Sequence, residues 1–199
     1  MLEYENQAIA NGFNIICGID EAGRGPLAGP VFAAAMILPF GYIPPGVDDS
    51  KKLSAKKREE LFDIITQNAA AYSVTSVDEK TIDEINILQA TFLAMRNAVL
   101  GLAVKPDIAL IAGNQKPGLG DLGIEERAIV KGDSLSASIA SASILAKVSR
   151  DRYMLELNKK YPEYKFNLHK GYGTKLHYEM LRLHGISPVH RMSFLKNFK

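Results

Sequence analysis

The segment 18–30, GIDEAGRGPLAGP, constrains the fold most strongly, because it joins two apolar runs through a turn rich in glycine and proline. The run before the turn predicts a strand over 14–20, and the run after it predicts a buried strand over 31–38. Asp20 and Glu21 stand where the first strand is expected to end. Paired carboxylates at a strand end can hold a hard divalent cation, which prefers oxygen ligands.

A Gly-Arg-Gly turn follows the two acids at 23–25. Glycines let the backbone approach a ligand closely and a guanidinium binds phosphate, so acids beside this turn favour phosphodiester chemistry. An ordinary turn next to a solvated acid pair fits the same residues. A dinucleotide-binding fingerprint is a weaker alternative, with Ala28 as its third small residue and Asp48 about 20 residues further on. Pro26 and Pro30 argue against it because they oppose a helix here, and Asp48 follows a loop rather than a strand.

Length and composition set broad limits on the class of protein. The 199 residues fit one domain, and 47% of them are hydrophobic, which is enough for a core. The 24 basic and 22 acidic residues give a net charge of +2, so composition alone does not identify a nucleic-acid partner. Cys17 is the only cysteine, which excludes an internal disulfide and fits a reducing compartment. With no signal pattern and no apolar run long enough to span a bilayer, the sequence predicts a soluble cytoplasmic protein.

Apolar periodicity and capping residues predict strands that alternate with helices. Further strands are expected over 72–77, 108–112 and 127–131. Helices are expected over 55–70, from a capping box at Thr81, over 134–161, and from Thr174 to a glycine cap at Gly185. Alanine and serine fill the first half of the segment 134–161, which lets a neighbouring element pack close. This order predicts one α/β domain over 1–199, with a mixed sheet of about five strands, helices on both faces and a helical C-terminal extension from about 162.

Two further segments carry charged residues at places suited to chemistry. Lys51 and Lys52 lie in DSKKLS at a loop-to-helix junction, where they suit phosphate contact or form a solvated charged face. Asp133 lies at an expected strand end just before a helix. It can cap that helix, or it can join Asp20 and Glu21 as a third carboxylate, because parallel strands bring their ends to one edge of a sheet.

Two segments near the C-terminus combine basic and aromatic residues. Tyr172 lies between glycines in HKGYGT, where it can stack on a base or sugar, or belong to an ordinary loop. The segment 190–194, HRMSF, fits either nucleic-acid contact or packing of the C-terminus. All four histidines follow residue 168 without paired ligand spacing, which argues against a zinc site.

Taken together and in this order, the motifs resemble those of bacterial ribonuclease HII. The matching segments are GIDEAGRGPLAGPV, DSKKLS, NILQATFLAM, KGDSLSASIASASILAKVSRDRYM, HKGYGT and HRMSF, which cover nearly the whole chain from residue 14. The resemblance implies a ribonuclease H-like fold and a divalent-metal endonuclease. Enzymes of this family cut RNA in RNA/DNA hybrids, and they cut on the 5′ side of single ribonucleotides in duplex DNA.

The resemblance also implies which residues hold the cofactor. Three of the family's four active-site acids correspond to Asp20, Glu21 and Asp133. The implied cofactors are Mg²⁺ or Mn²⁺, with two ions in an intact site. The implied partner is an RNA/DNA hybrid or a DNA duplex that contains ribonucleotides, bound by a monomer without membrane contact; no protein partner is identifiable.

The substrate-binding residues follow from the same resemblance. The loop that senses the ribose 2′-hydroxyl corresponds to Gly23, Arg24 and Gly25. Tyr172 corresponds to the tyrosine that packs on the sugar at the DNA–RNA junction. The expected phosphate contacts are Lys51, Lys52 and Lys147.

One family position differs in this chain. The family has its remaining acid in an Asp-Gly-Asn run at the end of a central strand, where this chain has Ala112, Gly113 and Asn114. Alanine offers no oxygen to a metal and removes one negative charge from the cluster, so we expect weakened metal binding and impaired or absent cleavage. Two origins fit this alanine: an introduced Asp→Ala change, which the intact motifs elsewhere favour, and a natural loss of catalysis.

Two other functions stay open on the residues alone. A non-catalytic protein could bind RNA–DNA junctions without cutting, and a small-nucleotide binder could use the glycine loop. The first would keep its affinity for a ribonucleotide-containing duplex but give no cleavage even after Ala112→Asp. The second would bind a mononucleotide in the absence of duplex DNA.

Overall fold

A five-stranded mixed sheet in the order β3-β2-β1-β4-β5 forms the centre of the fold. The computed structural model describes residues 1–196 and 198 of the chain. The strands are β1 (Ile16–Ala22), β2 (Val31–Ile37), β3 (Ala71–Val77), β4 (Ile108–Ala112) and β5 (Glu125–Ile129). β1 pairs antiparallel with β2 and parallel with β4, while β2–β3 is antiparallel and β4–β5 is parallel. The predicted α/β class with a mixed sheet of five strands is therefore confirmed.

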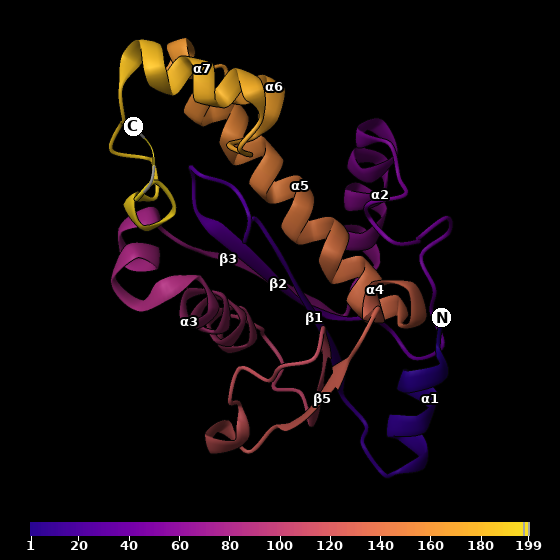
Figure 1. The fold of residues 1–199 in the computed structure, drawn as a ribbon. Helices are drawn as coiled ribbons and strands as arrows, with labels where there is room; N and C mark the ends of the chain where they lie inside the picture. Colours follow the sequence, from indigo (N-terminus) through magenta and orange to yellow (C-terminus); the bar gives the residue numbers. More distant parts are fainter. Residues whose placement is uncertain (197, 199) are drawn as a thin grey trace.

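Helices cover both faces of this sheet (Figure 1). The helices are α1 (Glu3–Ala10), α2 (Ala55–Asn68), α3 (Glu79–Leu100), α4 (Gly132–Leu135), α5 (Ala137–Lys160), α6 (Phe166–His169) and α7 (Lys175–His184), with short 3-10 turns η1 (Gly120–Leu122), η2 (Pro162–Tyr164) and η3 (Met192–Phe194). α3 packs against β2 and β3, and α5 packs against β1 and β2 with α2 beside it. Each face has its own apolar cluster, one containing Ile19 and Ile82 and the other containing Met36 and Leu61.

The close approach of α5 to the sheet depends on Gly18 in β1. A Cβ atom at this position would lie only 2.2 Å from the carbonyl carbon of Ser138, in the first turn of α5. The alanines and serines from Ala137 to Ala146 are all buried. The small residues of this segment therefore do what the sequence predicts, which is to let a neighbouring element pack close.

Two helix boundaries differ from the sequence-based prediction. The capping box predicts a helix opening at Thr81, but α3 begins at Glu79, because the Asp78 side chain accepts the Thr81 backbone N–H and acts as the cap. The continuous helix predicted over 134–161 is divided into α4 and α5, because Ser136 has an extended backbone and caps α5 with its side chain. The division leaves α4 as a separate turn at the end of β5.

Positive φ angles at two residues explain two further differences. The strand predicted over 127–131 lies at 125–129, because Lys131 has a left-handed φ of 57° that ends the extended backbone. Asn86 interrupts α3 with a φ of 67°, and its Oδ1 accepts the backbone N–H groups of Leu88 and Gln89. Asparagine tolerates this conformation better than most residues, and its side chain restarts the helix as an internal cap.

The C-terminal part is helical, as predicted, and lies at the far end of α5 (Figure 1). Met154 and Leu157 of α5 pack there with Phe166, Met180 and Leu181 in a separate apolar cluster. In the part of the chain that the structure describes, no helix has both the length and the apolar character needed to cross a bilayer.

Candidate active site

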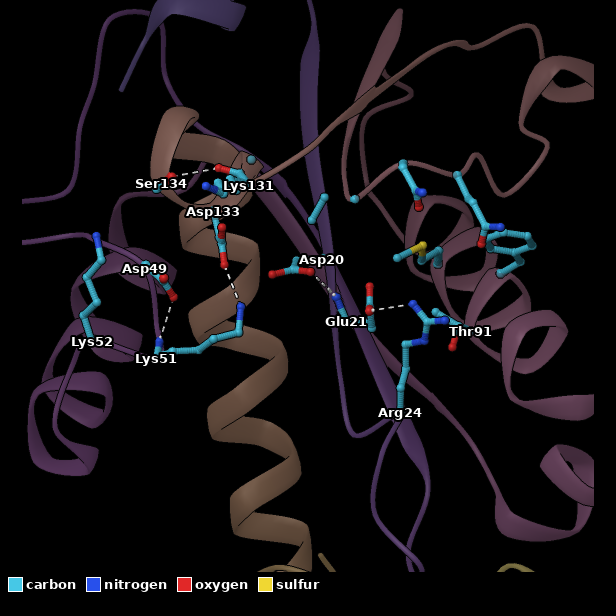
Figure 2. A pocket seen from close by; sticks show the side chains of 17 residues that line it. Asp20, Glu21, Arg24, Asp49, Lys51, Lys52, Thr91, Lys131, Asp133 and Ser134 are labelled. Atoms are coloured by element: carbon cyan, nitrogen blue, oxygen red, sulfur yellow. Dashed lines mark hydrogen bonds and ion pairs between the residues drawn. The ribbon is translucent and has the colours of Figure 1, made fainter. Parts of the chain in front are cut away.

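Two parallel neighbours, β1 and β4, bring the first candidate positions together at the point where their pairing stops. The strands pair as far as Ile19 and Ile111, so Asp20 and Ala112 are the next residues along each strand. Successive side chains of a strand point to opposite faces of a sheet. Asp20 therefore points toward α5, and Glu21 points toward the α3 side of the same sheet edge (Figure 2).

These side chains open into a cavity of about 600 Å³ (Figure 2). The predicted site residues that line it are Asp20, Glu21, Arg24, Lys51, Lys52, Ala112 and Asp133. They come from β1, β4, α4, the turn after β1 and the loop before α2. The structure thus gathers three acids and the alanine that are far apart in the sequence.

Asp133 enters the cavity from α4 and contacts a lysine from the opposite loop. Lys51 Nζ donates a hydrogen bond to Asp133 Oδ2 at 2.8 Å. The alternative role of Asp133 as a helix cap is wrong, because the residue lies inside the first turn of α4 and Lys131 occupies the cap position. Its carboxylate therefore faces the cavity, where it forms an ion pair with Lys51.

Burial changes the proton affinity of the two acids on β1. Asp20 is 7% exposed, and burial together with the Glu21 charge raises its pKa to about 8. Burial also raises the pKa of Glu21, while the guanidinium of Arg24 opposes that rise. Arg24 NH1 lies 3.5 Å from Glu21 Oε1. A cation beside these carboxylates would stabilise their charged forms.

The donor set fits a hard divalent cation in its chemistry. Asp20, Glu21 and Asp133 offer carboxylate oxygens, which are the ligands that Mg²⁺ and Mn²⁺ prefer. Within residues 1–196 and 198, no three acidic, histidine or cysteine side chains stand close enough to enclose an ion as they lie. Asp133 contacts Lys51 instead, so an ion that takes the Oδ2 oxygen of Asp133 must displace Lys51. Ala112 adds no oxygen at the fourth position.

A second cavity of about 300 Å³ adjoins the acids and shares Asp20, Glu21, Arg24 and Lys51 with the first. Its remaining predicted residues are Gly23, Gly25, Lys147 and Tyr172. Tyr172 is 41% exposed, which leaves its ring free to meet a ligand. Lys147 Nζ lies 5.9 Å from the centre of that ring and pairs with Asp151 at 2.6 Å. Lys52 does not reach this cavity; it pairs with Asp48 at 3.2 Å and lines the larger one.

Sequence reasoning missed the neutral residues around the acids. Ser50 and Ser143 are buried and share a hydrogen bond at 2.8 Å, and Ser143 opposes the rise in the pKa of Asp20. Thr91 and Met95 of α3 line the larger cavity as well. All four lie inside the matched motifs, which is the one sequence feature that could have indicated them.

Known proteins resemble this chain over nearly its full length. The family model described as Ribonuclease HII matches residues 17–197. A ribonuclease HII from Caldicellulosiruptor bescii is 58% identical over 195 residues, which are 98% of this chain and 93% of that protein.

Solved structures share the fold. A chain from a structure of the PCNA:RNase HII complex from Archaeoglobus fulgidus matches with a TM-score of 0.77 and 28% identity, over 90% of this chain and 94% of that one. Bst-RNase HIII in complex with Mn²⁺ matches with a TM-score of 0.71 and 21% identity, over 86% of this chain and 63% of that one.

Proposed function

Because this chain belongs to the ribonuclease HII family, we propose that it is a monomeric, single-domain endoribonuclease that uses Mg²⁺ or Mn²⁺. Its substrates are RNA in RNA/DNA hybrids and single ribonucleotides embedded in duplex DNA, which it cuts on the 5′ side. The reaction is hydrolysis of a phosphodiester bond.

The convergence of the acids on one cavity carries this proposal. Asp20, Glu21 and Asp133 line that cavity together with Arg24. Tyr172 lines the adjoining cavity beside the turn at 23–25. The 2′-hydroxyl separates a ribonucleotide from its DNA neighbours, so an acid cluster beside a surface that can touch a sugar suits cleavage at a ribonucleotide.

Asp20, Glu21 and Asp133 are the residues that would hold the divalent ions, which a related RNase HIII structure contains as Mn²⁺. When bound, such ions supply activation of the attacking water and stabilisation of the leaving 3′-oxygen. Asp20 and Glu21 have raised pKa values, so a cation also favours the deprotonated form that binds it.

The protein's own residues position the substrate. Backbone groups of the turn at 23–25 contact the ribose 2′-hydroxyl, and the Tyr172 ring packs against the junction sugar. Phosphate contacts come from Lys51, Lys52 and Lys147. Phosphate contacts fix the register of a duplex, while sugar contacts distinguish RNA from DNA.

Ala112 weakens the activity of this chain. It stands at the end of β4 next to Asp20 and lines the acid cavity without offering an oxygen. Loss of one carboxylate reduces the charge that balances two divalent ions. Each ~1.36 kcal/mol of lost transition-state stabilisation lowers the rate tenfold.

The test uses three duplexes: an RNA/DNA hybrid, a DNA duplex with one embedded ribonucleotide, and the matching all-DNA duplex. We expect this chain to bind the first two more tightly than the third, and any Mn²⁺-dependent product to end on the 5′ side of the ribonucleotide. Arg24→Ala and Tyr172→Ala should each reduce that preference. The proposal is abandoned if both variants discriminate between the duplexes as well as the parent does.

A non-catalytic junction-binding protein is the second candidate, and Ala112 is the observation that favours it. This second function predicts that the chain binds the two ribonucleotide-containing duplexes more tightly than the all-DNA duplex but forms no cleavage product. If Ala112→Asp also gives no Mn²⁺-dependent product while the preference is kept, the binding function is correct and the endonuclease is not.

A further inference from the structure

Two arginines outside the proposed chemistry are completely buried. Arg150 of α5 and Arg191 just before η3 are both 0% exposed. In the described part of the chain, all the hydrogen bonds found for their guanidinium groups go to backbone carbonyls. A buried cation is unfavourable unless its N–H groups are hydrogen-bonded. The two guanidinium groups therefore stabilise the backbone conformation that brings these carbonyls to them.

Arg191 closes the loop that contains the Gly-Arg-Gly turn. Its NH2 group donates to Gly23 O at 2.7 Å and to Gly29 O at 2.7 Å. Its NH1 group donates to Arg24 O at 2.9 Å, and its Nε donates to Gly29 O at 2.9 Å. One planar guanidinium therefore holds both ends of the loop over 23–29.

Arg150 joins this loop to the segment that carries Tyr172. Its Nε and NH2 groups donate to Pro30 O and Ala28 O, each at 3.2 Å. Its NH1 group donates to Lys170 O at 3.0 Å. The guanidinium carbon also lies 5.7 Å from the centre of the Tyr172 ring.

The segments around these arginines pack closely at two glycines. A Cβ at Gly23, whose φ is +97°, would lie 2.1 Å from Arg150 Nε. A Cβ at Gly171 would lie 2.5 Å from Ala28 O. The two segments are also bonded directly, since Leu27 N–H donates to Gly171 O at 2.8 Å.

Charge alone does not explain the pair. The buried acid Glu79 favours the charged form of both arginines, and one of its carboxylate oxygens has no hydrogen-bond partner among the described residues. Burial and the Arg150 charge lower the pKa of Arg191 to about 9, so it stays charged at neutral pH. Asp151 also favours the charged form of Arg150, and Asp83 favours that of Arg191 less strongly than Glu79 does. What distinguishes these arginines is that one planar guanidinium donates to several backbone carbonyls at once. A lysine ammonium cannot reproduce that geometry.

We infer that Arg150 and Arg191 are positioning residues for ribonucleotide recognition. They fix the turn at 23–25 relative to the Tyr172 ring, so that both meet the same sugar. The inference rests on the proposed function of that turn and that ring. It assigns specificity to two side chains that touch neither metal nor substrate.

The test compares the dissociation constants of two duplexes, one with a single ribonucleotide and one all-DNA, in EDTA so that no strand is cut. Arg150→Lys and Arg191→Lys should each lower the preference for the ribonucleotide at least tenfold. Arg152→Lys is the matched control, because Arg152 lies on the same helix, is exposed and pairs with Glu59. Its preference should stay within twofold of the parent. A loss of folded protein lowers binding of both duplexes equally, so a purely structural role leaves the ratio unchanged.

Amide hydrogen exchange gives a second measurement that needs no nucleic acid. In the parent, Leu27 and Gly29 N–H groups should exchange slowly, because both are bonded to the C-terminal part of the chain. Arg150→Lys and Arg191→Lys should speed exchange over 23–30 and 170–173, and Arg152→Lys should not.

The outcomes separate the two ideas. A parent that binds both duplexes equally overturns the proposed function, and amide exchange then decides the positioning role by itself. A parent that discriminates, with folded Arg150→Lys and Arg191→Lys variants that keep its ratio, overturns the positioning role. If the variants do not fold, hydrogen exchange in the parent decides. The positioning role is overturned if the Leu27 and Gly29 amides exchange as fast as those of residues 114–116, for which no backbone N–H hydrogen bond is found in the described structure.

Discussion

Lys51 holds its ammonium group 2.8 Å from the carboxylate of Asp133, which lines the same cavity as Asp20 and Glu21. The lysine side chain is 78% exposed and the aspartate side chain only 12%. An exposed lysine in an ion pair contributes little to stability and can move away at small energetic cost. We therefore expect Lys51 to compete with a divalent ion for the Asp133 carboxylate.

Lys51→Gln should increase the affinity for Mn²⁺. Removal of one positive charge a few ångströms from a divalent ion is worth on the order of 1 kcal/mol in surroundings like water, which corresponds to roughly fivefold to tenfold in the dissociation constant. Isothermal titration of the protein with MnCl₂ measures this. Lys52→Gln is the control, since Lys52 pairs with Asp48 at 3.2 Å, and it should change the affinity less. An affinity that falls in Lys51→Gln would show that Lys51 supports the site rather than competing for it.

Ala112→Asp should increase cleavage of a duplex with one ribonucleotide by roughly 100-fold or more, equivalent to ~2.7 kcal/mol of transition-state stabilisation. The new carboxylate would stand at the end of β4 beside Asp20 and supply the missing oxygen. The measurement is the single-turnover rate with Mn²⁺.

Asn114→Asp controls for charge in that experiment, because it adds a carboxylate to the same cavity two residues beyond Ala112. It should restore little activity. Equal rates for the parent and Ala112→Asp would remove position 112 from the mechanism.

Gly18→Ala should destabilise the fold by ~3 kcal/mol, because its Cβ would lie 2.2 Å from a backbone carbon of α5, which cannot move without lifting the helix from the sheet. Urea unfolding followed by far-ultraviolet circular dichroism measures the loss. Gly120→Ala is the matched control, since nothing lies within 4 Å of its added Cβ. If the two substitutions change the free energy of unfolding equally, close packing at Gly18 is not what the glycine provides.

The gathering of the acids could be predicted from the sequence because it depends on local patterns. Asp20 ends an apolar run and Asp133 follows another, and parallel strands bring such ends to one edge. The contact of Lys51 with Asp133 could not be predicted, because it joins residues 82 apart through the path of a loop. Motif resemblance identified the lysine but not its partner.

The burial of Arg150 also could not be predicted from the sequence. It lies in the polar run Ser149-Arg150-Asp151-Arg152, where an arginine is expected to be exposed to solvent. Only the fold shows that Arg150 is 0% exposed and faces the carbonyls of Ala28 and Pro30. Long-range backbone acceptors have no sequence pattern of their own, which is why positioning residues are harder to predict than acids.

A buried histidine cluster in the C-terminal part should make the protein less stable in mild acid. His177 Nε2 and His190 Nε2 are 3.0 Å apart, and His177 Nδ1 lies 3.0 Å from Tyr172 O. Burial, and then the neighbouring histidines, lower the pKa of both from 6.5 to about 4. Below pH 6.5 these two histidines become protonated in the unfolded chain but stay neutral in the folded chain. The free energy of unfolding therefore falls as the pH drops toward 4. Above pH 6.5 this contribution is fully present.

The expected loss between pH 6.5 and 4 is on the order of 2–3 kcal/mol for each of the two histidines, measured as the free energy of urea unfolding at several pH values. A His177→Gln, His190→Gln double variant should lose less stability over this range than the parent, and His184→Gln should behave like the parent because its side chain is outside the pair. Asp20 changes the stability with pH in the opposite direction, because its raised pKa favours the folded state as the pH falls. That contribution is present in every variant and cancels in the difference. If the free energy of unfolding changes with pH equally in the parent and the double variant, the pKa values of the two histidines are not lowered in the folded protein.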